Sequence, residues 1–371
     1  MKATGSALFL DNARSKRRPM IVIFLWAPGI RDAGSPWERP QSAEPAVAGE
    51  RVFASLFGAD CPRDFRWMSE RQRHIPPKAP SFPPLASWIR KYREGTPSFS
   101  SGAALSALDP IARSDHPLGA LWRQRLALKC AGALVQHIGR DEGEREIRDH
   151  FYFTKLGNSG PAGQIFATWL DLARFGMLRD RSLPVRLAKS FELPPSAANS
   201  IEDIFAATPE RQGNPVQAAA EIALMGLRLF PQVSLLAPWL VDATLSVQLR
   251  WPAPVPLIAS HIKRRDLRHA LDDGEDWLKA CHDAYAGAAS EAVELYIDLA
   301  RRSERLIDVA PKLRSHEADR IVERLLAKDA LLVEAGKYAT DRSIRRLFDR
   351  LVELGAVREF TGRSSFRLYG I

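Results

Sequence analysis

Arginine side chains gather in the last thirty residues of the chain, and the planar guanidinium group is well suited to binding phosphate. Four of these arginines follow one another at helical spacing, with a serine near the start of the same segment. Two more lie in the glycine-containing stretch that follows. We predict a nucleic-acid contact by Arg342, Ser343, Arg345, Arg346, Arg350, Arg363 and Arg367. In this interpretation the serine contacts a base or a phosphate, and the arginines contact phosphates.

A capped helix and a hairpin must position these side chains. Thr340 and Asp341 both suit an N-cap, and the apolar residues after them recur at helical spacing until Gly355, which suits the left-handed end of a helix. The segments Ala356–Phe360 and Ser365–Tyr369 predict two short strands joined by a turn that contains glycine. A helix, a glycine stop and an arginine-rich hairpin are typical of a winged helix-turn-helix ending.

A second interpretation of the same residues stays open. Arg346 with Asp349, and Arg350 with Glu353, can pair on a solvated helix face, and winged helices also bind proteins. The segment 329–339 is short for the second helix and turn that DNA docking requires. Two functions therefore compete: a DNA-associated or regulatory factor, and a non-enzymatic helical adaptor whose C-terminal module docks a partner protein or its own body.

The remaining pattern predicts a mainly α-helical protein in three parts. Residues 1–84 read as an irregular, proline-rich extension, residues 85–314 as a multi-helix domain, and residues 315–371 as a small winged-helix-like module with a β-hairpin. The clearest long helices are predicted over Pro256–Leu271 and Trp277–Val309.

Composition limits the classes of function. Of 371 residues, 46% are hydrophobic and 26% charged, which is ordinary for a globular protein. The net charge of +9 is unevenly distributed along the chain. Residues 301–371 hold 16 basic and 11 acidic side chains, whereas residues 94–300 hold 21 basic and 25 acidic side chains. The three cysteines have no disulfide or metal-ligand spacing, so we predict a cytoplasmic, soluble protein with no membrane partner. No motif predicts a metal, a cofactor or a catalytic set, and a non-enzyme is favoured.

Several separated motifs occur in order along the chain: Gly102-Ala103-Ala104-Leu105, Arg123-Gln124-Arg125-Leu126, Gly160-Pro161-Ala162-Gly163, Lys263-Arg264-Arg265-Asp266, Ala280-Cys281-His282 and the tail from Asp341. Together they resemble a bacterial family known as domain of unknown function 1403. The resemblance covers about residues 84–371 and implies no established activity. Part of the tail also resembles the winged-helix ending of some bacterial Fic proteins, although the catalytic His-Pro-Phe pattern of those enzymes is missing.

Overall fold

The computed structural model describes residues 77–91, 96–153, 159–207, 214–313, 316–332, 341–363 and 367–371. The prediction of a mainly α-helical protein with a small C-terminal β-element is confirmed. The part of the predicted extension before residue 77 lies outside these described residues. The α-helices are α2 (Ser87–Lys91), α3 (Pro97–Ala112), α4 (Leu118–His137), α5 (Glu144–Phe153), α6 (Gly160–Leu172), α7 (Leu183–Ser190), α8 (Ala197–Ala207), α9 (Pro215–Leu229), α10 (Leu236–Gln248), α11 (Arg264–Arg268), α12 (Gly274–Val309), α13 (His316–Ala327) and α14 (Asp341–Glu353).

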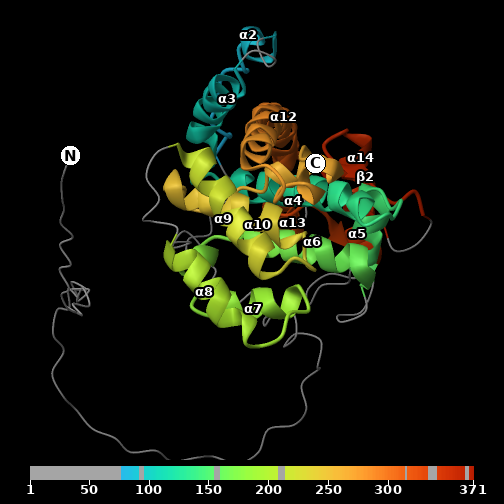
Figure 1. The fold of residues 1–371 in the computed structure, drawn as a ribbon. Coiled ribbons are helices and arrows are strands. Elements are labelled where there is room, and N and C mark those ends of the chain that lie inside the picture. Colours follow the sequence, from blue (N-terminus) through green and yellow to red (C-terminus); the bar gives the residue numbers. More distant parts are fainter. Residues whose placement is uncertain are drawn as a thin grey trace, which may run out of the picture. The chain divides into compact units, whose positions relative to one another are not determined.

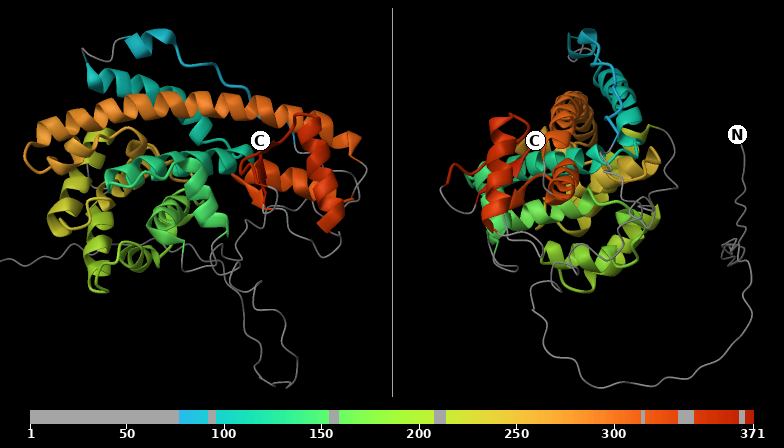
Figure 2. Two further views of the ribbon diagram at one scale, coloured as in Figure 1. Left: turned by 90° about the vertical axis from the view of Figure 1, so that its right-hand side faces the viewer. Right: turned by 180° about the vertical axis from the view of Figure 1, so that it is seen from behind.

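The longest helix, α12, runs through the helical body and has neighbours on both sides. Helices α2 and α3 lie along one side of it, and α4 lies on the other (Figures 1 and 2). Helix α9 also packs against α12 and pairs with α10, α6 packs against α4, and α7 and α8 lie farthest from α12. No helix in the described part of the chain is both long and apolar enough to cross a membrane.

The sequence explains why α12 forms as one element. The side chain of Asp273 accepts hydrogen bonds from the amides of Glu275 and Asp276, which closes the first turn. Small buried residues in the middle of the helix, among them Gly287 and Ala288, let neighbouring helices approach closely. The predicted helix over Trp277–Val309 is thus confirmed, with one extra turn at its start.

The predicted long helix over Pro256–Leu271 is wrong. This segment holds a 3₁₀ turn, η2 (Ile258–Ser260), and the five-residue α11. The buried carboxylate of Asp242 accepts the amide hydrogens of Leu257 and Ile258, so these two donors are fixed by a side chain and not by a helix. The backbone is extended at Lys263, where φ is −82° and ψ is 145°, and this separates η2 from α11 and prevents one continuous helix.

The C-terminal elements form a compact group with a three-stranded antiparallel sheet. Along the chain they are α13, β1 (Leu331–Leu332), α14, β2 (Arg358–Glu359) and β3 (Leu368–Gly370), and the strand order in the sheet is β1-β3-β2. The sequence pattern predicted both hairpin strands, and a two-residue loop at Gly362-Arg363 would place Arg358 opposite Arg367. This register is wrong. Arg358 faces Gly370, and this separates the two arginines along the ladder.

One hydrophobic core joins these elements to the helical body. The same buried cluster contains Trp122 of α4, Tyr296 of α12, Leu325 of α13, Phe348 of α14 and Tyr369 of β3. A second buried cluster, around Trp169 and Trp239, fills the space among α4, α6, α8 and α10. The C-terminal elements are therefore packed onto the body over an apolar surface.

Candidate nucleic-acid interface

Helix α14 presents its arginines because its other face is buried. Ile344, Leu347, Phe348 and Leu351 are each at most 8% exposed, and the ring of Phe348 stacks on Tyr369 with centroids 4.5 Å apart. The helix ends as predicted at Gly355, whose φ is +61°. The amide of Ala356 donates to the carbonyl of Leu351, which completes a Schellman-type cap. Local sequence thus fixes both the rotation and the end of this helix.

The predicted contact residues of α14 all lie in the solvent. Arg342, Ser343, Arg345, Arg346 and Arg350 are exposed. Within the described residues, Arg342 and Arg346 form no hydrogen bond or ion pair, whereas Ser343 and Arg345 have interactions of their own. Arg350 pairs with Glu353 at 3.0 Å, and both side chains are more than half exposed. A solvated ion pair of this kind contributes little to stability, and another anion can easily replace Glu353 beside Arg350.

The two predicted arginines of the hairpin are bound to carboxylates of the same chain. Arg363 lies 2.7 Å from Asp149 of α5, and its guanidinium stacks over the ring of Phe153 at 5.4 Å. Arg367 lies 3.9 Å from Glu359 and 4.0 Å from Asp349, and its Nε donates to the carbonyl of Arg363. The structure therefore separates the predicted set into an open group on α14 and a paired group on the hairpin.

A buried ionic junction, which the sequence did not predict, attaches the C-terminal elements to the body. Asp329, between α13 and β1, is fully buried. Its carboxylate lies 2.5 Å from Nε of Arg125 on α4 and 2.7 Å from Nε of Arg148 on α5. Both guanidinium groups also stack on the ring of Phe360, at 4.9 and 4.7 Å. We call these four residues the Asp329 junction.

Backbone contacts strengthen the Asp329 junction. Nη2 of Arg125 donates to the carbonyl oxygens of Asp329 and Ile371, both at 3.1 Å. Gln124 donates to the carbonyl of Ala327 and accepts the amide hydrogen of Asp329. Burial lowers the pKa of Arg125 and the charge of Asp329 opposes this effect, so the carboxylate keeps the guanidinium charged.

A weak signal for this junction was present in the sequence. Arg123 and Arg125 interrupt an otherwise apolar stretch of α4, and Asp329 stands next to the buried residues Ala330 and Leu331. A charge on a buried helix face must find an opposite charge. The local pattern does not indicate which acidic residue is the partner, because Arg148 and Asp329 are 181 residues apart.

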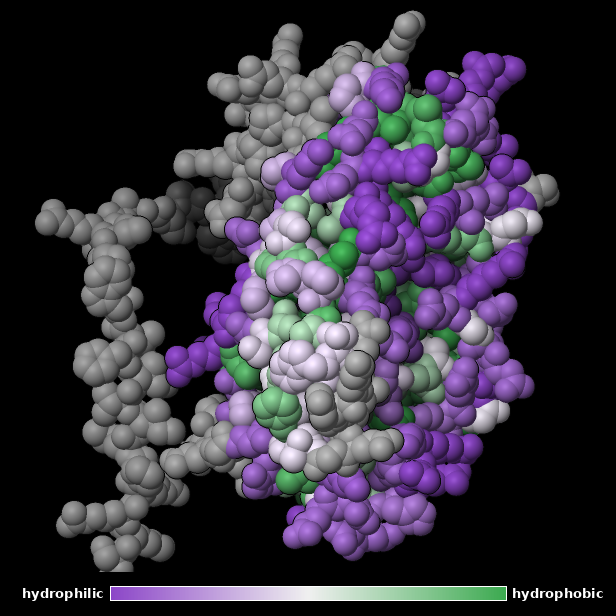
Figure 3. Space-filling model, turned by 90° about the horizontal axis from the view of Figure 1, so that it is seen from above, coloured by the Kyte–Doolittle hydropathy of each residue, from purple (hydrophilic) through white to green (hydrophobic). Residues whose placement is uncertain are grey.

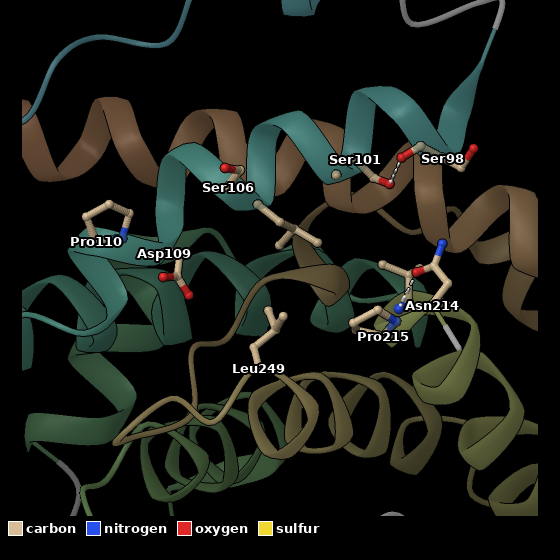
Figure 4. A pocket seen from close by; sticks show the side chains of 11 residues that line it. Ser98, Ser101, Ser106, Asp109, Pro110, Asn214, Pro215 and Leu249 are labelled. Atoms are coloured by element: carbon tan, nitrogen blue, oxygen red, sulfur yellow. Dashed lines mark hydrogen bonds between the residues drawn. The ribbon is translucent and has the colours of Figure 1, made fainter. Parts of the chain in front are cut away.

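A pocket of about 350 Å³ lies elsewhere, between α3 and the start of α9 (Figure 4). None of the predicted contact residues lines it. Three of its polar side chains already have partners: Asp109 accepts from Arg113 and Trp251, Asn214 accepts from the amide of Val216, and Ser101 bonds to the carbonyl of Ser98. The bond from Trp251 joins α3 to the loop after α10, and the other three are local to α3 or to the start of α9.

A chain of polar side chains ties η2 to two helices. Ser260 Oγ lies 2.9 Å from Nδ1 of His261, and Nε2 of His261 lies 3.3 Å from Glu291 of α12, which also pairs with Lys129 of α4. The sequence suggested no serine–histidine–carboxylate set. The Ser260 hydroxyl donates to the carbonyl of Leu257 at 2.7 Å, so the chain fastens the turn between α4 and α12.

The carboxylate of Asp242 fixes the backbone at the start of the same turn, η2. Its fully buried carboxylate accepts from the amides of Leu257 at 2.7 Å and Ile258 at 3.1 Å, and from the hydroxyl of Tyr285 at 2.9 Å. Burial raises the pKa of Asp242 to about 7, although the three donors oppose this shift. The free thiols of Cys130 and Cys281 are buried nearby, and burial raises the pKa of both.

Comparison with known proteins agrees with the motifs in the sequence. No curated protein matches the chain at a significant level. A family model described as a protein of unknown function, DUF1403, matches residues 68–371, which is most of the chain. The protein therefore belongs to the DUF1403 family.

Proposed function

We propose that this protein binds double-stranded DNA through the exposed face of α14, by contacts to backbone phosphates. The observation that carries the proposal is the pair Arg342 and Arg346. These two side chains lie one helical turn apart, both are exposed, and neither has a partner within the described residues. Two like charges at this spacing repel each other, and a phosphate between them would reverse that effect.

The order of the C-terminal elements supports this proposal. The elements follow one another as helix, strand, helix and two strands, and the sheet order is β1-β3-β2. This is the arrangement expected of a winged helix. In such modules the last helix is the one that contacts DNA. The segment in which a second helix was in question, residues 333–340, lies outside the described residues.

The hairpin has a smaller part in the proposed contact than the sequence suggested. Because Arg363 and Arg367 lie against carboxylates of the chain, a phosphate would have to displace Asp149 or Glu359. The proposed interface is therefore centred on Arg342 and Arg346, with Ser343, Arg345 and Arg350 on the same helix.

The test compares duplex binding by the wild-type chain and Arg342→Ala/Arg346→Ala, using fluorescence anisotropy over a range of salt concentrations. Each lost phosphate contact lowers the slope of log K against log salt by about 0.9, so the double variant should lose about 1.8 in slope. The loss should be similar for duplexes of unrelated sequence.

The matched control is Arg264→Ala/Arg268→Ala. It removes an exposed pair of arginines at the same spacing from α11, which precedes the start of α12, whereas α14 ends beside Arg305 near the other end of α12. The control should bind as the wild type does. Equal losses in both variants would show that only overall charge matters, and an unchanged slope in the α14 variant would overturn the proposal.

The adaptor function is the second candidate, and the paired hairpin favours it. Since Arg363 binds Asp149 of the body and Arg367 pairs with Asp349 of α14, the hairpin resembles a docked surface more than a phosphate clamp. In an adaptor, α14 would bind an acidic protein surface. Arg342→Ala/Arg346→Ala would then leave DNA retention unchanged and abolish co-purification of one defined partner.

A further inference from the structure

A second arginine pair lies beside the end of α14, on the long helix α12. The guanidinium of Arg305 covers the backbone of Gly355, with Nη2 2.9 Å from the position that a Cβ atom would take there. Arg305 is exposed. Residues far apart in the sequence therefore meet where α14 ends, as Figure 2 also shows for the two helices.

Arg301 lies one turn before Arg305 on the same exposed face of α12. Within the described residues, neither side chain forms a hydrogen bond or an ion pair. Two of the acidic side chains near this pair are engaged elsewhere, since Asp298 pairs with Arg302 and Asp308 pairs with Lys78, and in the described part of the chain Glu304 forms no ion pair with either arginine. The spacing repeats that of Arg342 and Arg346, so α12 and α14 each carry one uncompensated pair.

Part of this arrangement has a structural explanation. A cation at the C-terminal end of a helix interacts favourably with the helix dipole, and Arg305 stands at that end of α14. The same explanation does not extend to Arg301, a full turn away. Like charges four residues apart destabilise a helix unless an anion lies between them.

We infer that Arg301 and Arg305 form a second phosphate-binding site, which takes the backbone of the same DNA duplex that α14 contacts. This inference rests on the proposed function. Charge complementarity selects the ligand, because both pairs offer guanidinium groups without a carboxylate partner. Hydrophilic side chains also gather along the α14 side of the face seen from above, whereas paler residues lie over α2 and α3 (Figure 3).

The length of the combined surface fits a duplex. From Arg342 to Gly355 the chain advances thirteen residues, or about 20 Å at the helical rise of about 1.5 Å per residue. A duplex places a phosphate on each strand about every 3.4 Å along its axis, so about six phosphates per strand pass over this length. Arg305 adds a guanidinium at the end of α14, where the sequence of α14 itself offers Glu353.

The experiment measures binding of one labelled DNA duplex by four full-length proteins as salt is raised. They are the wild type, Arg301→Ala/Arg305→Ala, Arg342→Ala/Arg346→Ala and the control Arg264→Ala/Arg268→Ala. We expect the α12 variant to lose about 1.8 in the log–log salt slope, as two phosphate contacts require. Between about 50 and about 200 mM salt the wild type should therefore lose roughly tenfold more affinity than this variant.

The variant Arg301→Lys/Arg305→Lys separates charge from packing. Lysine keeps the positive charge, so most of the slope should return if the site binds phosphate. A wild-type slope in the alanine variant, with a reduced slope in the α14 variant, would overturn this inference and leave the proposed function standing. Wild-type slopes in both variants would overturn the inference and the proposed function together.

Discussion

At the scale of single residues, the electrostatic environment of each charge decides what it can do. Arg342 and Arg363 are both arginines of the predicted contact set, but one is free in solvent within the described residues and the other is paired with Asp149. The sequence cannot distinguish them, because the carboxylate that pairs with Arg363 comes from α5. Only the free arginines have charge available for an external anion.

Asp242 gives a prediction about pH. Its pKa in the folded state is about 7, above the value of about 3.9 expected in the unfolded chain, so the folded state alone holds the proton between these values. The stability linked to this proton is therefore complete below about pH 4 and is lost as the pH rises through about 7. The loss amounts to at most about 4 kcal/mol of unfolding free energy.

Urea denaturation of the wild type and Asp242→Asn, from about pH 4.5 to about pH 8, measures this effect. The asparagine cannot titrate, so the stability difference between the two proteins should change with pH in the stated direction. Asp308→Asn, at an exposed carboxylate, is the control and should follow the wild type. A difference that stays constant with pH would show that Asp242 ionises at its ordinary pKa.

At the scale of the elements, α14 is the best example of a structure determined locally. Its apolar spacing predicts which face is buried, and Gly355 predicts where it ends, because both depend on neighbouring residues alone. The loop after α10 behaves in the opposite way. Its apolar spacing favours one helix, but the backbone is extended at Lys263 and divides the segment between η2 and α11, while Asp242 binds the amides of Leu257 and Ile258.

Gly355→Ala should destabilise the protein by about 1–2 kcal/mol, because an L-residue with a side chain is strained at a φ of +61°. The added Cβ atom would also displace the guanidinium of Arg305. Thermal unfolding followed by circular dichroism measures the change. The control is Gly274→Ala at the start of α12, where nothing lies within 4 Å of the new atom. Equal stability of the two variants would contradict the left-handed end of α14.

At the scale of the whole molecule, a continuous core and the Asp329 junction join the C-terminal elements to the helices. Leu325, Phe348 and Tyr369 share one buried cluster with Trp122 and Tyr296. The junction adds a fully buried carboxylate between guanidinium groups of α4 and α5. This attachment fixes the orientation of α14, and with it the direction in which Arg342 and Arg346 point.

Asp329→Asn should therefore destabilise the whole body by about 3–5 kcal/mol, since it leaves two buried arginines without their counter-charge. Differential scanning calorimetry should show one unfolding transition that shifts as a unit to lower temperature. The exposed pair of Lys78 and Asp308 supplies the control, because Asp308→Asn should change stability by less than about 1 kcal/mol. A separate early transition, with the main one unmoved, would show that the C-terminal elements unfold independently.

The sequence by itself determined the helical class, the position and burial of α14, its glycine end, and the exposure of its arginines. These features follow from residue types within a few positions of one another, where helical periodicity and backbone chirality act. Tertiary structure alone decided the hairpin register, the loop after α10, and which arginines have a carboxylate partner. The physical reason is distance along the chain: Arg148 and Asp329, 181 residues apart, acquire their roles only when folding brings them within 2.7 Å.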